Sequence, residues 1–543
     1  MRNQRTLFFG RRPPRTPQKD GTNPPVPDRR FAAVAPNEID IRFSNRTVTQ
    51  FGGYPLWASF LDEVGLDAGI AQHIKMARGP RAFTAPELSR FLIDSKVLGA
   101  DRLMHLERFR LDPLLTATAG IDGLPSGKTM GVYLKQFTEG NLAGLDRYNT
   151  RTIGRLWKKA HPGKSKPGVV LDYDSETTTA YGKQEGADRG RSFRKKDKPG
   201  YQPRYGFIGG TGLMVHRELL PQSHNLGKDF IRFHEETVLR VPKKAKIWAV
   251  RADAAVYSFG HIRYFEKRKL VYAISAVKTP HLKEAIAQIP RDAWVDGEDE
   301  EGRPYSIARL RYCPKTWDKK KRTFIISRRL RHDSHQRLLL GDDIYKYFAC
   351  ITNYKAPIET QFLFSTERCS LESFIKEGKG NFHSNFLPCK ELSANQAYLG
   401  HVQLAYNLAI FFKMLGVPPG VNRWTIQTLR DRIFSICGNL RRIQGRWVLS
   451  LPNWWPYQTV FRKIPAPRPL GPPDVVVQRH QKTGTDRLPS RRRCAPIEFK
   501  SARFHRRAVF RSKRASRDAE VALKQPPPPD ILHPELRSAK NPG

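Results

Sequence analysis

The chain has 543 residues, and 95 Lys and Arg against 51 Asp and Glu give a formal net charge of +44. An excess this large favours a polyanionic partner, and nucleic acid is the commonest polyanion inside cells. Hydrophobic residues make up 39% and aromatic residues 10% of the sequence. That content is enough for a folded core, so it excludes a wholly disordered chain.

Cysteines and apolar stretches exclude two further classes of protein. The six cysteines include no C-x-x-C pair, so the sequence supports neither a zinc ribbon nor a secreted disulfide framework. The most apolar stretch, residues 397–417, contains His401, Gln403, Asn407 and Lys413. These polar residues predict a buried helix instead of a membrane span. The first residues lack the apolar region of a signal peptide, so we expect an intracellular protein.

The composition changes along the chain. Residues 1–37 and 464–543 are rich in Pro and Arg and are predicted to be disordered basic arms. Residues 38–160 have helical periodicity, with a capping box at Thr84 and Glu87, and are predicted to form a helical N-terminal DNA-binding domain.

A strand-rich pattern follows. VVLDYDSETTTAY predicts a strand and RYGFIGGTGLMVHRELL a hairpin, after which IWAVRAD, a helical stretch and LVYAISAV predict a parallel βαβ unit. The expected class is therefore α/β, with a mixed five-stranded sheet and flanking helices. The predicted segments are the first part of the core at 161–278, a β-rich insertion at 279–362, the second part of the core at 363–416 and a C-terminal helix and strand extension at 417–463.

Several acids lie at informative positions in this pattern. Asp172, Asp174 and Glu176 are two residues apart on one strand, so they share a face, and spacing alone does not choose among them. Asp253 follows a buried strand, where open α/β sheets assemble their sites, although it could instead cap the next helix. Glu372 lies on a predicted helix.

Three basic residues share the predicted helical face of Glu372: Arg368, Lys376 and Lys379. This stripe could be a solvated, salt-bridged helix face. Alternatively, it could bind phosphates beside a cluster of carboxylates, which repel one another unless a hard cation such as Mg²⁺ neutralises them. Two such ions about 4 Å apart can activate one oxygen and stabilise another that leaves phosphorus.

At these residues the sequence resembles the DDE transposases of the bacterial insertion-sequence, cut-and-paste type, over about residues 38–463. Five blocks carry the resemblance in the family's order: LDYDSETTTAYGKQEGA at 171–187, GYQPRYGFIGGTG at 200–212, VRADAAVYS at 250–258, RCSLESFIKEGKG at 368–380 and SANQAYLGHVQLAYNL at 393–408. The resemblance implies a ribonuclease-H-like catalytic core. The 119 positions from Asp253 to Glu372 resemble the branch with a β-rich insertion.

The resemblance also implies which acids are catalytic. In this family small hydroxyl residues follow the first acid, which selects Asp174 over Asp172, and Asp253 resembles the second acid. Glu372 fits the third. The three would hold two Mg²⁺ ions, for which Mn²⁺ can substitute.

The third acid of the family lies in a signature of Tyr, two residues, Arg, three residues, Glu, six residues, then Lys or Arg. Arg368, Glu372 and Lys379 fit it, and Ser365 stands at the Tyr position. The implied DNA-binding residues are Arg368, Lys376 and Lys379. Trp317, in the insertion, could stack on an extruded base or pack in the core.

The function implied by the resemblance is binding of the ends of a mobile DNA element, followed by strand cleavage and strand transfer. The expected partner is double-stranded DNA, at the element ends and at the target, bound by a dimer on paired ends, with no membrane and no small-molecule substrate. The expected location is the cytoplasm, in association with the nucleoid. Two alternatives stay open: a nuclease of the same fold without strand transfer, and a catalytically silent DNA-binding relic.

Overall fold

The structure is a computed structural model that describes residues 39–43, 46–76, 82–163, 165–190, 198–299, 302–330, 345–367 and 369–465, without the side chains of 369–373 and 376. The arm predicted at 1–37 lies outside the described residues. Of the tail predicted at 464–543, the structure describes residues 464 and 465, and the rest lies outside the described residues.

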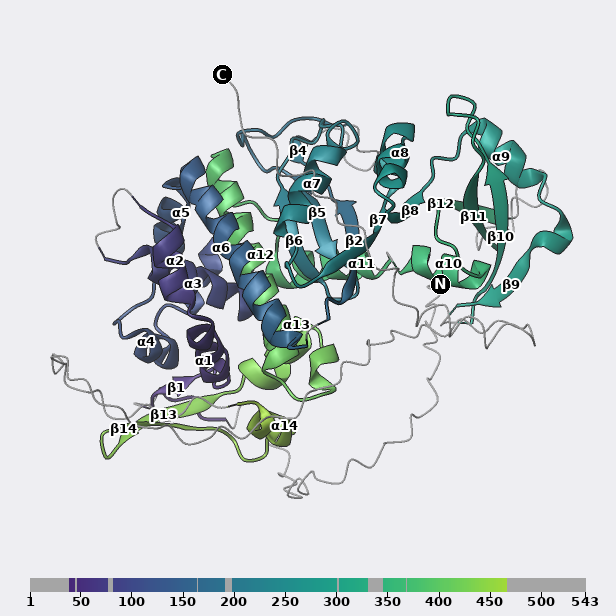
Figure 1. Cartoon of the computed structure of the whole chain (residues 1–543). Helices are drawn as coiled ribbons and strands as arrows, with labels where there is room; N and C mark the ends of the chain where they lie inside the picture. Colours follow the sequence, from purple (N-terminus) through teal and green to yellow (C-terminus); the bar gives the residue numbers. More distant parts are fainter. Residues whose placement is uncertain are drawn as a thin grey trace, which may run out of the picture.

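A large mixed sheet forms the centre of the molecule (Figure 1). Within the described residues it has nine strands in the order β6-β5-β2-β7-β8-β12-β11-β10-β9. The predicted core supplies β2 (Gly168–Ser175), β5 (Arg204–Ile208), β6 (Leu213–Glu218), β7 (Lys246–Ala252) and β8 (Val271–Ser275). β2 pairs antiparallel with β5 and parallel with β7, and β7 pairs parallel with β8. The prediction of an α/β protein with a mixed sheet is confirmed.

The insertion extends this same sheet, which the sequence did not predict. Its strands are β9 (Val295–Glu298), β10 (Pro304–Tyr312), β11 (Arg322–Leu330) and β12 (Tyr345–Thr352). β12 pairs antiparallel with β8, so that Cys350 lies opposite Ser275. A core that ended at β8 would leave a row of backbone hydrogen-bonding groups unpaired, and β12 covers this edge. Short strands β3 (Thr178–Thr179) and β4 (Gly200–Tyr201) pair separately.

Helices cover both faces of the sheet, and alternate residues of β2 point to opposite faces. Tyr173 packs against Phe230 and Phe233 of α7 (Phe230–Arg240), with ring centroids 5.0 and 5.8 Å away. On the opposite face, Phe207 of β5 lies 6.4 Å from Phe374 of α11 (Cys369–Phe382). Because Phe207 pairs with Asp172, the acids of β2 face α11. The crossover between β7 and β8 is α8 (Phe259–Lys267).

The N-terminal segment is helical: α1 (Tyr54–Val64), α2 (Leu66–His73), α3 (Ala85–Val97), α4 (Pro113–Ala119), α5 (Gly127–Lys135) and α6 (Glu139–Ala160), with the 3₁₀ turn η2 (Leu103–Arg108). α3 begins at the predicted capping box, in which the Glu87 amide donates to the Thr84 hydroxyl and the Thr84 amide donates to the Glu87 carboxylate. The remaining helices are α9 (Pro280–Ala287), α10 (Ile358–Thr366), α12 (Leu392–Leu415), α13 (Ile426–Leu429) and α14 (Gln458–Lys463).

Helix α12 joins the N-terminal helices to the sheet. Most of its residues are buried, and it packs against α3, α5 and α6 on one side and β6 on the other. One hydrophobic cluster consequently extends from Phe51 through both parts to Ile464. In the part of the chain that the structure describes, no helix combines the length and apolar character needed to cross a bilayer.

Asn407 provides the polar connection in this interface. Its side-chain oxygen accepts from the Met214 amide at 2.9 Å, and its amide donates to the Met214 carbonyl at 2.8 Å and to Asn149 at 3.2 Å. Gln403 also donates to the Met214 carbonyl at 2.8 Å, so losing the Asn407 side chain removes the partner of the buried Met214 amide and of the Asn149 side-chain oxygen.

We expect Asn407→Ala to lower the free energy of unfolding by about 2–4 kcal/mol, because two or more buried hydrogen-bonding groups lose their partner. Denaturant unfolding measures this change. The exposed Gln288→Ala, at the end of α9, is the control and should change stability by less than about 0.5 kcal/mol. Equal effects of the two substitutions would contradict the role of Asn407.

Candidate active site

Two carboxylates lie at the ends of adjacent parallel strands. Asp174 is in the last part of β2, and Asp253 directly follows β7. The parallel register pairs Asp172 with Arg251, and continuing it by two residues brings position 174 opposite position 253. Neighbouring strands are about 4.8 Å apart, so the two carboxylates leave the sheet side by side. Both residues are half-buried.

Local backbone contacts orient these two acids. The Ser175 amide donates to Asp174 Oδ1 at 2.8 Å. Asp253 caps the 3₁₀ turn η3 (Ala254–Val256), and its Oδ1 accepts from the Ala255 amide at 3.1 Å. The capping role, considered as an alternative for Asp253, is therefore present. A carboxylate that accepts one backbone bond keeps other lone pairs, so capping leaves capacity for a cation.

Asp172 has a different environment although it shares the strand face. It is fully buried, and the guanidinium of Arg251 donates to both of its carboxylate oxygens, at 2.6 and 2.8 Å. Arg251 also donates to the Phe364 carbonyl at 3.0 Å and to Glu367 at 2.8 Å. Burial acts to lower the pKa of Arg251, but Asp172 and Glu367 outweigh it and the net shift is upward. Asp172 is thus a structural acid.

Glu176 connects β2 to α11. Its carboxylate is buried and accepts from the Tyr205 hydroxyl at 2.8 Å, and Lys379 Nζ lies 2.5 Å from the other oxygen. Burial lowers the pKa of the Lys379 ammonium below its usual value, while Asp174 nearby acts to raise it. Of the residues predicted to bind DNA, Lys379 therefore lies beside Asp174 and is already paired with Glu176.

Helix α11 carries the third predicted acid, Glu372, between two anchored positions. Glu367, just before α11, bonds Arg251 next to Asp172, and Lys379 on α11 contacts Glu176. Position 372 lies between these two anchors, as position 174 lies between 172 and 176 on β2. The side chains of Glu372, Arg368 and Lys376 lie outside the described part of the structure.

A second group of possible metal ligands lies at the edge of the sheet. His216, Glu218 and Glu236 bring ligand atoms within 4.8 Å of one another. Burial, together with Arg240 and Arg217, lowers the pKa of His216 to about 2. Glu218 pairs with Arg204 at 2.5 Å, and both glutamates pair with Arg232 at 2.8 and 2.6 Å. These arginines already supply the positive charge, so the group is an ion-pair network.

Trp317 is half-buried and packs against the hydrophobic core. Its ring lies 5.4 Å from Tyr257 and 5.5 Å from Phe259, which follow Asp253 in the chain, and the Arg322 guanidinium lies 5.5 Å from its centroid. These contacts favour the core-packing role considered from the sequence. The loop from β10 to β11 thereby supports the segment after Asp253.

Sequence reasoning missed the two ion pairs that surround the acids. The signals were present, since Arg251 precedes Ala252 and Asp253 in VRAD and Glu176 lies two residues after Asp174. Neither signal specifies a partner, because the pairing of β2 with β7 and of β2 with α11 depends on the three-dimensional fold.

Among the comparisons with known proteins, a family model covers most of the chain. A family model described as transposase DDE domain group 1 matches residues 31–467. No curated protein matches the sequence. Among solved structures, a piggyBac transposase synaptic complex with hairpin DNA is 12% identical, covers 68% of this chain and 77% of that chain, and has a TM-score of 0.34. That TM-score supports no inference, so the assignment to a family depends on the family model.

We expect Asp172→Asn and Asp174→Asn to affect different properties. Removing the charge of Asp172 leaves the buried Arg251 with only the more exposed Glu367 as a carboxylate partner, which should cost up to about 3–5 kcal/mol of unfolding free energy. Asp174 is half-buried at a strand end, so Asp174→Asn should change stability by less than about 1 kcal/mol. Thermal and denaturant unfolding measure both. Wild-type stability in Asp172→Asn would contradict the structural role of the pair.

Proposed function

The chain belongs to the DDE transposase family, in its domain group 1, and we propose that it binds the ends of a mobile DNA element and catalyses strand cleavage and strand transfer. The enzyme class follows from the family: a DDE transposase is a metal-dependent enzyme that cuts DNA. We also propose that the mobile element is of the bacterial insertion-sequence type.

The catalytic acids in this proposal are Asp174, Asp253 and Glu372. The observation that supports them best is the parallel register of β2 and β7, which brings positions 174 and 253 to adjacent strand ends. The anchors of α11 on Arg251 and Glu176 support the approach of position 372 to the same place. The strand order β6-β5-β2-β7-β8 supports a ribonuclease-H-like core for these acids.

Membership of this family implies a divalent metal ion, and we propose two Mg²⁺ ions, with Mn²⁺ able to substitute. The donor set fits, because half-buried carboxylate oxygens at adjacent strand ends are ligands that Mg²⁺ prefers. When bound, such ions activate the attacking oxygen and stabilise the leaving oxygen at phosphorus. Asp172 is not a metal ligand in this proposal, because Arg251 neutralises its charge and its side chain is buried away from water.

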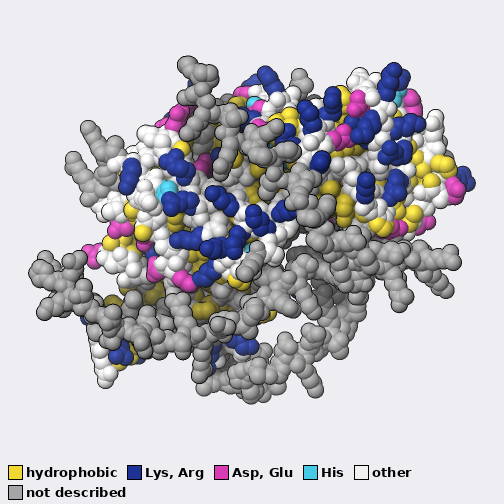
Figure 2. All heavy atoms as spheres, in the orientation of Figure 1, with side chains coloured by type: hydrophobic (Ala, Val, Ile, Leu, Met, Phe, Trp, Pro, Cys, Tyr) yellow, Lys and Arg dark blue, Asp and Glu magenta, His cyan; other side chains and the backbone are white. Residues whose placement is uncertain are grey.

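We propose that the polyanionic partner is DNA and that Arg368, Lys376 and Lys379 contact its phosphates. A dimer of the chain would bind the paired element ends. Figure 2 shows Lys and Arg side chains gathered on one face, over α6 and over the insertion strands. Lys379 is 35% exposed and paired with Glu176, so a phosphate would compete with Glu176 for it. The location proposed is the cytoplasm, in association with the nucleoid.

Glu372→Gln keeps the size of the side chain but removes the charge that would hold a metal. The variant should bind the DNA that flanks the coding region as tightly as the wild type, yet cleave it orders of magnitude more slowly. Gel-based cleavage and filter-binding assays with Mg²⁺ measure the two properties. Glu284→Gln, on the surface of α9, is the matched control and should cleave normally. Near-normal cleavage by Glu372→Gln would overturn the assignment of the third acid.

Metal binding can be tested without DNA. Mn²⁺ should raise the melting temperature of the wild type, since a ligand that binds only the folded state stabilises it by an amount that grows with the logarithm of ligand concentration above Kd. Asp174→Asn and Asp253→Asn should abolish most of this rise, while Glu218→Gln at the ion-pair network should retain it. A rise that persists without Asp174 and Asp253 would place the metal elsewhere.

A further inference from the structure

A β-hairpin projects from the body of the protein beside the N-terminal helices. Its strands are β13 (Gly438–Ile443) and β14 (Arg446–Ser450), which pair from Asn439 with Ser450 to Ile443 with Arg446 (Figure 1). The turn residues Gln444 and Gly445 have φ angles of +48° and +76°. Two central residues with positive φ are typical of a type I′ turn, whose twist matches that of the strands, so the turn is well defined.

The outer part of this hairpin is exposed on both faces and strongly basic. All eight residues from Arg441 to Val448 are exposed, including Trp447 at 60%, Ile443 at 49% and Val448 at 37%. The sequence 438–450, GNLRRIQGRWVLS, contains three arginines and no acid. Large apolar side chains on an exposed ribbon usually mark a surface that a partner covers.

Each face of the hairpin combines arginine with an apolar side chain. Arg442 lies opposite Trp447 on one face. On the other face, Arg441 lies opposite Val448 and Ile443 opposite Arg446. A partner that covers the hairpin must therefore accept cations and apolar groups on both sides at once.

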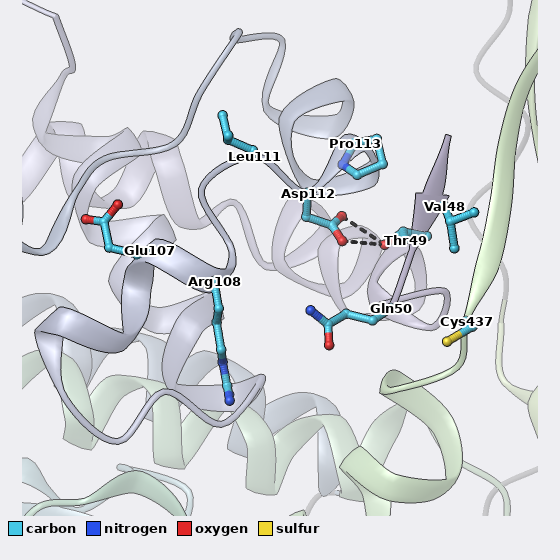
Figure 3. A pocket seen from close by; sticks show the side chains of 9 residues that line it. All are labelled: Val48, Thr49, Gln50, Glu107, Arg108, Leu111, Asp112, Pro113 and Cys437. Carbon is cyan, nitrogen blue, oxygen red and sulfur yellow. Dashed lines mark hydrogen bonds between the residues drawn. The ribbon is translucent and has the colours of Figure 1, made fainter. Parts of the chain in front are cut away.

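The base of the hairpin is firmly attached. β1 (Val48–Thr49) pairs with β13, the Leu440 amide donates to the Thr47 carbonyl at 2.9 Å, and the Leu440 side chain is buried. The Thr49 hydroxyl in turn bonds the Asp112 carboxylate at 2.8 and 2.9 Å, at the edge of a pocket that also includes Cys437 (Figure 3). Asp112 caps α4, so the hairpin is connected to the helical body.

We propose that this hairpin is a DNA-binding arm that enters a groove of duplex DNA, an inference that rests on the function proposed above. The major groove, about 12 Å wide, admits a two-stranded ribbon. Ribbon side chains then meet phosphates and base edges on both sides, which suits arginines on both faces. In the groove, the side chains of Trp447 and Ile443 pack against sugars and base edges and are thereby removed from water.

A second copy of the chain is the other possible occupant, because β14 is an edge strand in the described sheet. Pairing of two β14 strands would bring arginines of both copies together without an acid in either hairpin. Like charges at such distances are destabilising, so the charge favours DNA over self-association.

The test measures the affinity of the full chain for a short mixed-sequence duplex as a function of salt. The triple variant Arg441→Ala, Arg442→Ala and Arg446→Ala should lower the slope of log K against log salt by up to about 0.9 per arginine. Trp447→Ala should weaken binding by a similar factor at every salt concentration and leave the slope unchanged, because its contact is apolar. Each variant should keep the wild-type melting temperature.

The matched control removes the same charge elsewhere: Lys243→Ala, Arg263→Ala and Lys267→Ala, all exposed, in the turn before β7 and on α8. Its slope should change by much less than that of the hairpin variant. Equal changes in both triple variants would overturn the proposal, since they would reflect net charge alone. A hairpin variant that binds normally but loses a dimer in sedimentation would overturn it in favour of self-association.

Failure of this inference and failure of the proposed function are distinguishable in the same experiment. If the wild-type chain binds duplex DNA with a steep salt dependence and the hairpin variants do the same, only the arm is refuted. If the wild type does not bind duplex DNA, the proposed function itself fails.

Discussion

The buried ion pair between Asp172 and Arg251 is the interaction on which the arrangement of the candidate site depends. Removing two charges from water costs several kcal/mol per ion, and only excellent geometry with further hydrogen bonds compensates for it. Arg251 meets both conditions, because it donates to both oxygens of Asp172, to the Phe364 carbonyl and to Glu367. One side chain therefore fixes β2, β7 and the segment before α11 relative to one another, immediately below the ends of the two strands.

Helix α11 is also held further along its length. Lys379 contacts Glu176 of β2, and Arg430 donates to the Asn381 carbonyl near the end of the helix. Arg430 also donates to the Lys96 and Val97 carbonyls, at the end of α3. Burial lowers the pKa of Arg430 to about 10, so the ion still keeps its charge at neutral pH. The helix that carries Glu372 is consequently tied both to the sheet and to the N-terminal helices.

Much of the fold could be predicted from sequence, because local patterns specify it. Alternating and continuous apolar runs predicted the strands β2, β5, β6, β7 and β8, and the capping box predicted the start of α3. The continuation of the sheet through β12 could not be predicted, since strand pairing across 75 residues leaves no local signal. Periodicity likewise placed Asp172, Asp174 and Glu176 on one face, but their roles depend on residues far away in the sequence.

These three acids show how one strand face can supply both structure and chemistry. Asp172 and Glu176 are buried, and each has a cationic partner, Arg251 or Lys379, that cancels its charge. Asp174, between them, stays half-buried at the end of the strand. The flanking acids therefore add little negative potential of their own beside Asp174. An unpaired acid at 172 or 176 would add negative charge beside Asp174 and widen the region that attracts cations. The two ion pairs thus leave little uncompensated charge on the acids that flank Asp174, one of the residues proposed above to bind the metal.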